Sequence, residues 1–180
     1  MNNDKSVTHT IGHLIDGQIV NDTVRTQPVF NPATGQVSGH VALASKATVE
    51  QAIASAEKAF PDWRNTPPLK RARVMSRLKV LLEEHADEIA QLITAEHGEY
   101  SSYVPELLKG EHSRNAGPGI DSWAEHQPLG VTAGITPFNF PAMVPLWMWP
   151  MAVACGNSFV LKPSERDPSS ALRIAELALE

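Results

Sequence analysis

Two short apolar runs separated by a longer one constrain the fold of this chain more than any other feature. Segments 129–135 and 157–161 have the length and composition of buried strands, and the apolar segment 142–155 between them has the length of a helix. A helix that connects two strands in this order places them in parallel. The sequence therefore predicts an α/β fold in which both strands end at the same edge of a sheet.

Polar residues gather where each of these predicted strands ends. The first cluster is Gly134-Ile-Thr-Pro-Phe-Asn-Phe-Pro141, and the second is Val160-Leu-Lys-Pro-Ser-Glu-Arg166. Ligands of open parallel sheets bind beyond the carboxyl ends of the strands. We therefore expect the two clusters to hold a small polar ligand between them.

The composition excludes disorder of the whole chain and argues against a nucleic-acid surface. Of the 180 residues, 42% are hydrophobic and 19% are charged, and the net charge of −5 gives a weakly negative field. One predicted helix carries a basic cluster, consisting of Lys70, Arg71, Arg73, Arg77 and Lys79. Acidic residues follow it at once, so we interpret the cluster as a solvated helix face.

The cysteine content and the N-terminus favour a cytoplasmic protein. The single cysteine, Cys155, excludes an internal disulfide and fits a reducing compartment. The start Met-Asn-Asn-Asp-Lys is too polar for a secretory signal and lacks the character of a transit peptide. The only long apolar run, 142–155, contains two prolines and is shorter than a bilayer requires, so we expect a buried helix and no membrane contact.

The N-terminal residues predict a β arm. Asp16-Gly17 is a tight-turn signal between two apolar runs within 13–20, residues 29–35 form a turn-rich connection, and 37–43 follow as a further strand. We assign residues 1–44 to an N-terminal hairpin and β arm and residues 45–180 to a second unit, a partial α/β domain.

Helical spacing of apolar residues predicts four further helices. The first follows Ser45 as its N-cap and ends at Pro61, the second begins near Pro67 or Pro68, and the third ends at Gly98. Residues 99–127 favour loop and short strand, and Pro168 opens the last helix, which packs Ile174 and Leu177 inward. A single strand pair cannot complete a parallel sheet, so we expect an incomplete domain.

The motifs resemble those of the NAD-dependent aldehyde dehydrogenase superfamily, and most closely its CoA-acylating methylmalonate-semialdehyde dehydrogenases. The family-wide motifs are Asn-Phe-Pro at 139–141, Ala-Cys-Gly-Asn at 154–157 and Lys-Pro-Ser-Glu at 162–165. Features closer to the subfamily stand at 107–112, 119–121, 127–130 and 135–147. The resemblance covers nearly all of the chain from Leu14 onward. It implies an incomplete, Rossmann-type NAD-binding domain with an N-terminal β-hairpin arm.

The resemblance also implies how the clusters would bind NAD. Lys162 would donate to the hydroxyls of the adenosine ribose, and Glu165 would accept from the same ribose. Thr136 and Phe138 would line the dinucleotide groove, and Arg166 would border its adenosine end. The implied substrates are a small-molecule aldehyde and CoA, and full-length members of the family are homo-oligomers.

Asn139 is the catalytic residue that the resemblance implies. Its side-chain amide would stabilise the oxyanion formed when a cysteine thiolate attacks the aldehyde. Hydride transfer to NAD and release of the thioester by CoA would follow, in an activity used in valine, pyrimidine and inositol catabolism. An asparagine before Phe-Pro can also cap the next helix, and we favour the catalytic role.

The match to the family breaks in two places. The family places its catalytic cysteine and its pyrophosphate loop beyond residue 180, and we interpret Cys155, on an apolar helix end, as an inert thiol. Between Gly98 and Tyr100 the family carries a further helix of roughly 15 to 20 residues, with an arginine that binds the substrate carboxylate. No residue here matches that arginine. We therefore expect the 180 residues to be catalytically inactive alone.

Two other functions are compatible with the sequence. One is a non-catalytic assembly module, because the β arm resembles the oligomerisation element of the family. The other is an unrelated small nucleotide-binding α/β protein, which tight NAD binding by the chain alone would favour. The seven histidines form no His-Glu-x-x-His pattern and have no companion cysteines, so no metal site is expected.

Overall fold

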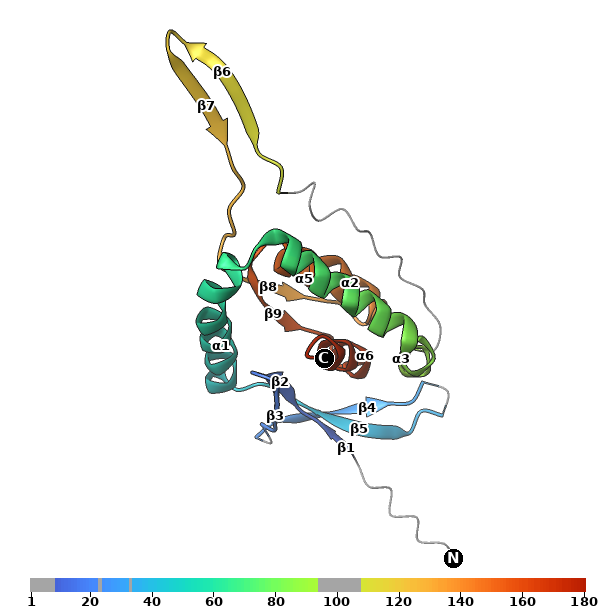
Figure 1. The fold of residues 1–180 in the computed structure, drawn as a ribbon. Helices are drawn as coiled ribbons and strands as arrows, with labels where there is room; N and C mark the ends of the chain where they lie inside the picture. The colour runs from blue at the N-terminus through green and yellow to red at the C-terminus, as the bar shows by residue number, and fades with distance from the viewer. Residues whose placement is uncertain (1–8, 23, 33, 94–107) are drawn as a thin grey trace, which may run out of the picture.

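The fold has an N-terminal group of strands, a parallel strand pair flanked by helices, and a hairpin that projects from them (Figure 1). The computed structural model describes residues 9–22, 24–32, 34–93 and 108–180. Within these ranges, none of the helices combines the length and the apolar character that crossing a bilayer requires.

The predicted N-terminal hairpin is confirmed. Strands β2 (His13–Ile15) and β3 (Gln18–Val20) pair antiparallel, and the turn residues Asp16 and Gly17 have φ angles of 51° and 72°. Glycine adopts this left-handed conformation without strain, which is why the dipeptide marks the turn.

The arm contains two strands that the sequence did not predict. Strand β5 (Val37–Ala42), which was expected, pairs in parallel with β1 (His9–Ile11) and antiparallel with β4 (Thr26–Phe30). The expected connection over 29–35 is therefore wrong at its start, because Val29 and Phe30 belong to β4. The turn itself begins at Asn31, whose carbonyl accepts the N–H of Gly35 at 2.8 Å.

Asp22 joins the arm to the first helix, α1 (Lys46–Asn65). Its carboxylate accepts the hydroxyl proton of Thr48 at 2.7 Å and the backbone N–H of Ser45 at 2.8 Å, and these bonds lower the pKa of Asp22 well below its usual value. Ser45 in turn accepts the N–H of Thr48 at 3.2 Å, which confirms it as the N-cap.

Helix α1 does not end at Pro61, as the sequence predicted, but continues through it to Asn65. Trp63 explains how the last turn is held despite the proline. Its indole N–H donates to the carbonyl of Val153 at 2.7 Å, which ties the end of α1 to a residue 90 positions away. A tertiary contact therefore outweighs the local preference of proline here.

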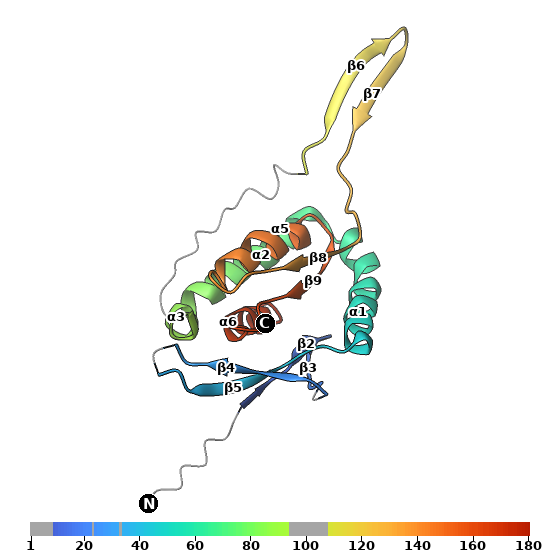
Figure 2. The same ribbon diagram turned by 180° about the vertical axis from the view of Figure 1, so that it is seen from behind.

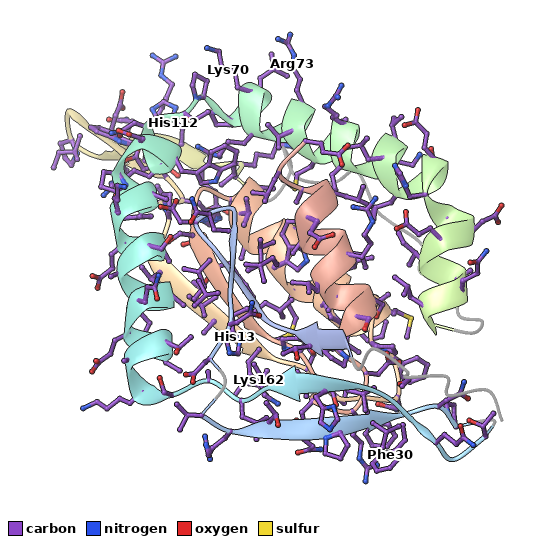
Figure 3. All side chains as sticks on the ribbon, turned by 90° about the horizontal axis from the view of Figure 1, so that it is seen from below. His13, Phe30, Lys70, Arg73, His112 and Lys162 are labelled. Carbon is purple, nitrogen blue, oxygen red and sulfur yellow. The ribbon has the colours of Figure 1, made fainter. Side chains whose placement is uncertain are left out.

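The second helix, α2 (Pro68–Glu84), begins as predicted. The third helix, α3, spans Ala86–Ile93, and its expected end at Gly98 lies outside the described residues. Met75, Leu78 and Leu81 of α2 are buried, as their spacing indicates. The basic cluster is solvated with one exception. Lys70 and Arg73 extend away from the helix (Figure 3), but Arg71 is only 3% exposed, so its assignment to the solvated face is wrong.

The strand, helix, strand unit is confirmed in its order and direction. Strands β8 (Val131–Ile135) and β9 (Ser158–Lys162) pair in parallel with Ile135 opposite Lys162, and α5 (Met143–Ala154) connects them. The expected burial of both strands is wrong: Val131 and Ile135 are 37% and 77% exposed. The reason is that each strand has a single neighbour among the residues described.

The last helix, α6 (Ser169–Leu177), lies between the β8–β9 pair and the N-terminal strands (Figures 1 and 2). Ile174 and Leu177 are almost fully buried, as predicted, in a core cluster with Leu78 of α2 and Ile89 of α3. This core packs α6 against α2 and α3.

Residues 108–124 form a more regular structure than the loop and short strand that the sequence predicted. Strands β6 (Glu111–Gly117) and β7 (Ile120–Ala124) form an antiparallel hairpin that projects from the rest of the molecule (Figures 1 and 2). Trp123 and Ile120 on this hairpin are 73% and 60% exposed.

Candidate functional site

The loops after β8 and β9 meet directly beyond the strand ladder. The backbone N–H of Thr136 donates to the carbonyl of Lys162 at 3.1 Å, one residue past the last pair of the ladder. This bond extends the parallel register into the loops, so the two polar clusters start from one edge of the sheet, as expected.

Lys162 and Glu165 form an ion pair on the second loop. Their Nζ and Oε2 atoms are 2.7 Å apart, and both side chains remain partly exposed. The hydrogen bond from Lys162 is the main reason that the pKa of Glu165 lies below its usual value, so Glu165 is a carboxylate at neutral pH. An exposed ammonium and carboxylate side by side can donate to and accept from neighbouring hydroxyls.

A cation–π contact joins the two loops at a second point. The guanidinium of Arg166 lies 4.8 Å from the centre of the Phe138 ring, which is 52% exposed. The backbone N–H of Arg166 also donates to the hydroxyl of Ser164 at 3.2 Å, and Ser164 is buried. This turn directs the Arg166 side chain from the second loop toward the first.

The structure therefore brings five of the six predicted site residues together through bonds or contacts: Thr136, Phe138, Lys162, Glu165 and Arg166. Thr136 is buried, and its hydroxyl oxygen has no hydrogen-bond partner among the described residues. Asn139 has an exposed side chain in the loop that carries Phe138, one residue farther along.

The sequence did not single out Asp167, which lies next to Arg166. Its side chain is half-buried, and burial raises the pKa of its carboxyl above the usual value. An acidic residue in a short loop before a helix is a common feature, so the pattern offered no signal that would distinguish it.

Cys155 lies at the other edge of the strand pair from this site. It follows α5, whose 12 residues extend about 18 Å from the loop that carries Asn139. Burial raises the pKa of the Cys155 thiol, and the nearby charge of Arg71 opposes this only in part. A thiol at this distance with a raised pKa is unsuited to attack a substrate held beside Asn139.

Two residues with structural roles were also missed by sequence reasoning. Arg71 donates to backbone carbonyls at the ends of two helices, and Asn157 holds the start of β8. The spacing of Arg71 from Met75 and Leu78 on one helix face was a signal for the first. The position of Asn157 in the Ala-Cys-Gly-Asn motif was a signal for the second.

Comparison with known proteins identifies relatives over almost the whole chain. The model of the aldehyde dehydrogenase family matches residues 19–180. The chain is 56% identical to a malonate-semialdehyde dehydrogenase of Pseudomonas aeruginosa, over 93% of this chain and 37% of the relative. It therefore spans less than two fifths of the length of that enzyme.

Solved structures show the same partial coverage. The methylmalonate-semialdehyde dehydrogenase DddC from Oceanimonas doudoroffii is 65% identical, with a TM-score of 0.90 over 94% of this chain and 38% of that one. A Sinorhizobium meliloti 1021 protein assigned to the same enzyme type, complexed with NAD, is 44% identical with a TM-score of 0.91, over 97% of this chain and 39% of that one. The fold is thus that of part of an aldehyde dehydrogenase.

The alignment lengths show that the relatives carry additional residues. The alignment with the Pseudomonas enzyme spans 185 positions, whereas 93% of 180 residues is about 167, so about 18 residues of the relative have no counterpart here. This number fits the predicted missing helix. Its predicted position, between Gly98 and Tyr100, lies outside the described residues.

Proposed function

The chain belongs to the aldehyde dehydrogenase family, and from this premise we propose that it is the N-terminal, cofactor-binding part of a methylmalonate-semialdehyde dehydrogenase. The whole enzyme would oxidise malonate or methylmalonate semialdehyde to an acyl-CoA, with NAD and CoA as co-substrates. Residues 1–44 would form the arm and residues 45–180 the partial NAD-binding domain, with the boundary between β5 and α1. The single cysteine supports a cytoplasmic location.

The observation that carries this proposal is the Lys162–Glu165 ion pair at the edge where the two loops meet. The pair fits the ribose of NAD, because a diol can accept from the ammonium and donate to the carboxylate without leaving either charge unpaired. The buried Thr136 hydroxyl, which lacks a partner among the residues described, adds a further polar group beneath the same edge. When bound, NAD would supply the hydride acceptor.

Asn139 would act on the aldehyde rather than on the cofactor. Its amide N–H is a hydrogen-bond donor on an exposed loop, next to Phe138, and would stabilise negative charge on the aldehyde oxygen during attack. The attacking thiolate must come from another part of the enzyme, because Cys155 lies at the opposite edge and has a raised pKa. We propose that the 180 residues alone do not turn over.

A nucleoside titration tests the cofactor site without requiring activity. Adenosine added to the labelled chain is expected to shift the backbone amide NMR signals of the loops after β8 and β9. Lys162→Met should weaken this binding about 5- to 10-fold, because it removes one charge-assisted hydrogen bond to the ribose. Lys70→Met, on the exposed face of α2, is the matched control and should leave the affinity unchanged.

Three results would each contradict part of the proposal. If adenosine at millimolar concentration shifted no signals of these loops, the site would not bind a nucleoside. If Lys162→Met bound adenosine as well as the unaltered chain, the ion pair would have no role in recognition. Turnover of malonate semialdehyde with NAD and CoA by the 180 residues would contradict the proposed inactivity.

A second candidate function is a non-catalytic assembly module, which the projecting β6–β7 hairpin favours. The side chain of Trp123, which is 73% exposed, gives one face of this hairpin a large apolar group that another subunit could cover. Co-purification with an intact member of the family would support this function. A chain that stayed strictly monomeric in its presence would argue against it.

A further inference from the structure

The two cations at the edge of the candidate site, Lys162 and Arg166, have different partners. Lys162 and Glu165 neutralise each other at 2.7 Å. The guanidinium of Arg166 contacts the Phe138 ring instead, and it forms no ion pair with any residue that the structure describes. The guanidinium of Arg166 is therefore not neutralised by a direct ion pair, although the residues on either side of it in sequence, Glu165 and Asp167, are acidic.

The contact between Arg166 and Phe138 joins the two loops of the proposed dinucleotide site. Arg166 directly follows Glu165, which would bind the adenosine ribose, and Phe138 directly precedes Asn139, which would act at the reacting carbon. The two segments are joined here and through the bond from Thr136 to Lys162. A dinucleotide that spans the site from ribose to reacting carbon carries its diphosphate midway between these ends.

The geometry of the contact leaves Arg166 able to bind an anion. The contact with the ring gives the guanidinium N–H donors no hydrogen-bond acceptor, so these donors can still bind an anion. The Ser164 hydroxyl fixes the backbone of Arg166, and the half-exposed Phe138 ring supports the side chain from one side. The donors are thus held in place before an anion arrives, which reduces the ordering that binding requires.

We propose that Arg166, in contact with the Phe138 ring, binds the diphosphate of the dinucleotide cofactor. This inference rests on the proposed function, because it assumes that Lys162 and Glu165 bind the ribose. It assigns to Arg166 the recognition of charge, not of the adenosine. Replacement of Arg166 should therefore leave the affinity for a nucleoside without phosphates unchanged. It should lower the affinity for a nucleoside diphosphate.

A comparison of adenosine with ADP separates these roles. Binding of both to the full 180-residue chain is measured by amide NMR titration at low salt. Arg166→Gln should lower the affinity for ADP about 5- to 10-fold, as expected for the loss of charge-assisted hydrogen bonds to phosphate. It should change the affinity for adenosine less than about two-fold. Arg77→Gln removes the same charge from an exposed position on α2 and should change neither. Phe138→Leu removes the ring that Arg166 contacts. It should lower the affinity for ADP but not for adenosine, and by less than Arg166→Gln does.

Each other outcome overturns a defined part of the inference. If the unaltered chain bound neither ligand, the proposed function and this inference would both fail. If adenosine bound and Arg166→Gln left ADP unchanged, only the diphosphate role would fail. If Arg166→Gln lowered the affinities for adenosine and ADP equally, Arg166 would support the ribose site instead. If Arg77→Gln had the same effect as Arg166→Gln, the cause would be net charge and not a local site.

Discussion

Replacement of Arg71 with methionine is expected to lower the free energy of unfolding by about 3 to 5 kcal/mol or to prevent folding, because it leaves three carbonyl groups, one buried and two partly buried, without their hydrogen-bond donor. The Nε atom of Arg71 donates to the carbonyl of Ala154 at 2.9 Å, and Nη1 donates to the carbonyls of Arg64 and Thr66. These acceptors lie at the C-terminal ends of α5 and α1, where helix carbonyls lack partners and carry negative partial charge. A single buried cation thus satisfies two helix ends.

Urea unfolding followed by far-UV circular dichroism measures this effect. Arg73→Met, on the exposed face of the same helix, is the matched control and should change the free energy of unfolding by less than about 0.5 kcal/mol. Arg71→Lys should fall between the two, because one ammonium cannot reach all three carbonyls. If Arg71→Met lowered the free energy of unfolding as little as Arg73→Met, water would replace the guanidinium. The two helix ends would then not be held by Arg71.

Arg71 also shows what a charge pattern can miss. Basic residues near one another in a helical sequence were assigned together to a solvated face, and four of the five are exposed. The pattern of basic residues does not indicate which of them contacts the ends of neighbouring helices. Because those ends belong to segments that precede and follow the helix, only the tertiary structure reveals that one basic residue turns inward.

The parallel unit was predictable because its signals are local. Two apolar strands separated by an apolar helix permit one parallel arrangement, and the polar residues that follow the strands then share an edge. The continuation of α1 through Pro61 was not predictable, since it depends on the bond from Trp63 to Val153. Strand β4 was missed because Pro28, a residue that weakens a strand assignment, stands in its middle.

The candidate site follows the same division. The resemblance selected the six candidate residues, and the strand register explains why the loops that carry them meet. The contact between Arg166 and Phe138 was not expected, because it joins residues 28 positions apart in sequence and depends on the turn at Ser164. Sequence patterns indicate which residues lie at this edge of the sheet. Only the structure shows which of their charged groups form ion pairs and which, like Arg166, do not.

Asn157→Ala is expected to lower the free energy of unfolding by about 2 to 4 kcal/mol, because Asn157 is buried and makes three hydrogen bonds with its amide group. Its Oδ1 atom accepts the backbone N–H groups of Leu129 and Gly130 at 2.7 and 3.1 Å, and Nδ2 donates to the carbonyl of Ala152 at 3.0 Å. It thereby ties the end of α5 to the start of β8.

Urea unfolding again provides the measurement, with Asn65→Ala on the exposed end of α1 as the matched control. Hydrogen exchange of the β8 amides adds a local readout, since Gly130 also accepts the N–H of Ser158 at 3.1 Å and so sets the first pair of the parallel ladder. Relative to the unaltered chain, the exchange rate of these amides in the variant should increase more than that of the α6 amides. Because the same register brings Thr136 to Lys162 at the other end, unaltered stability and exchange would mean that the site is aligned by its own loops and not by Asn157.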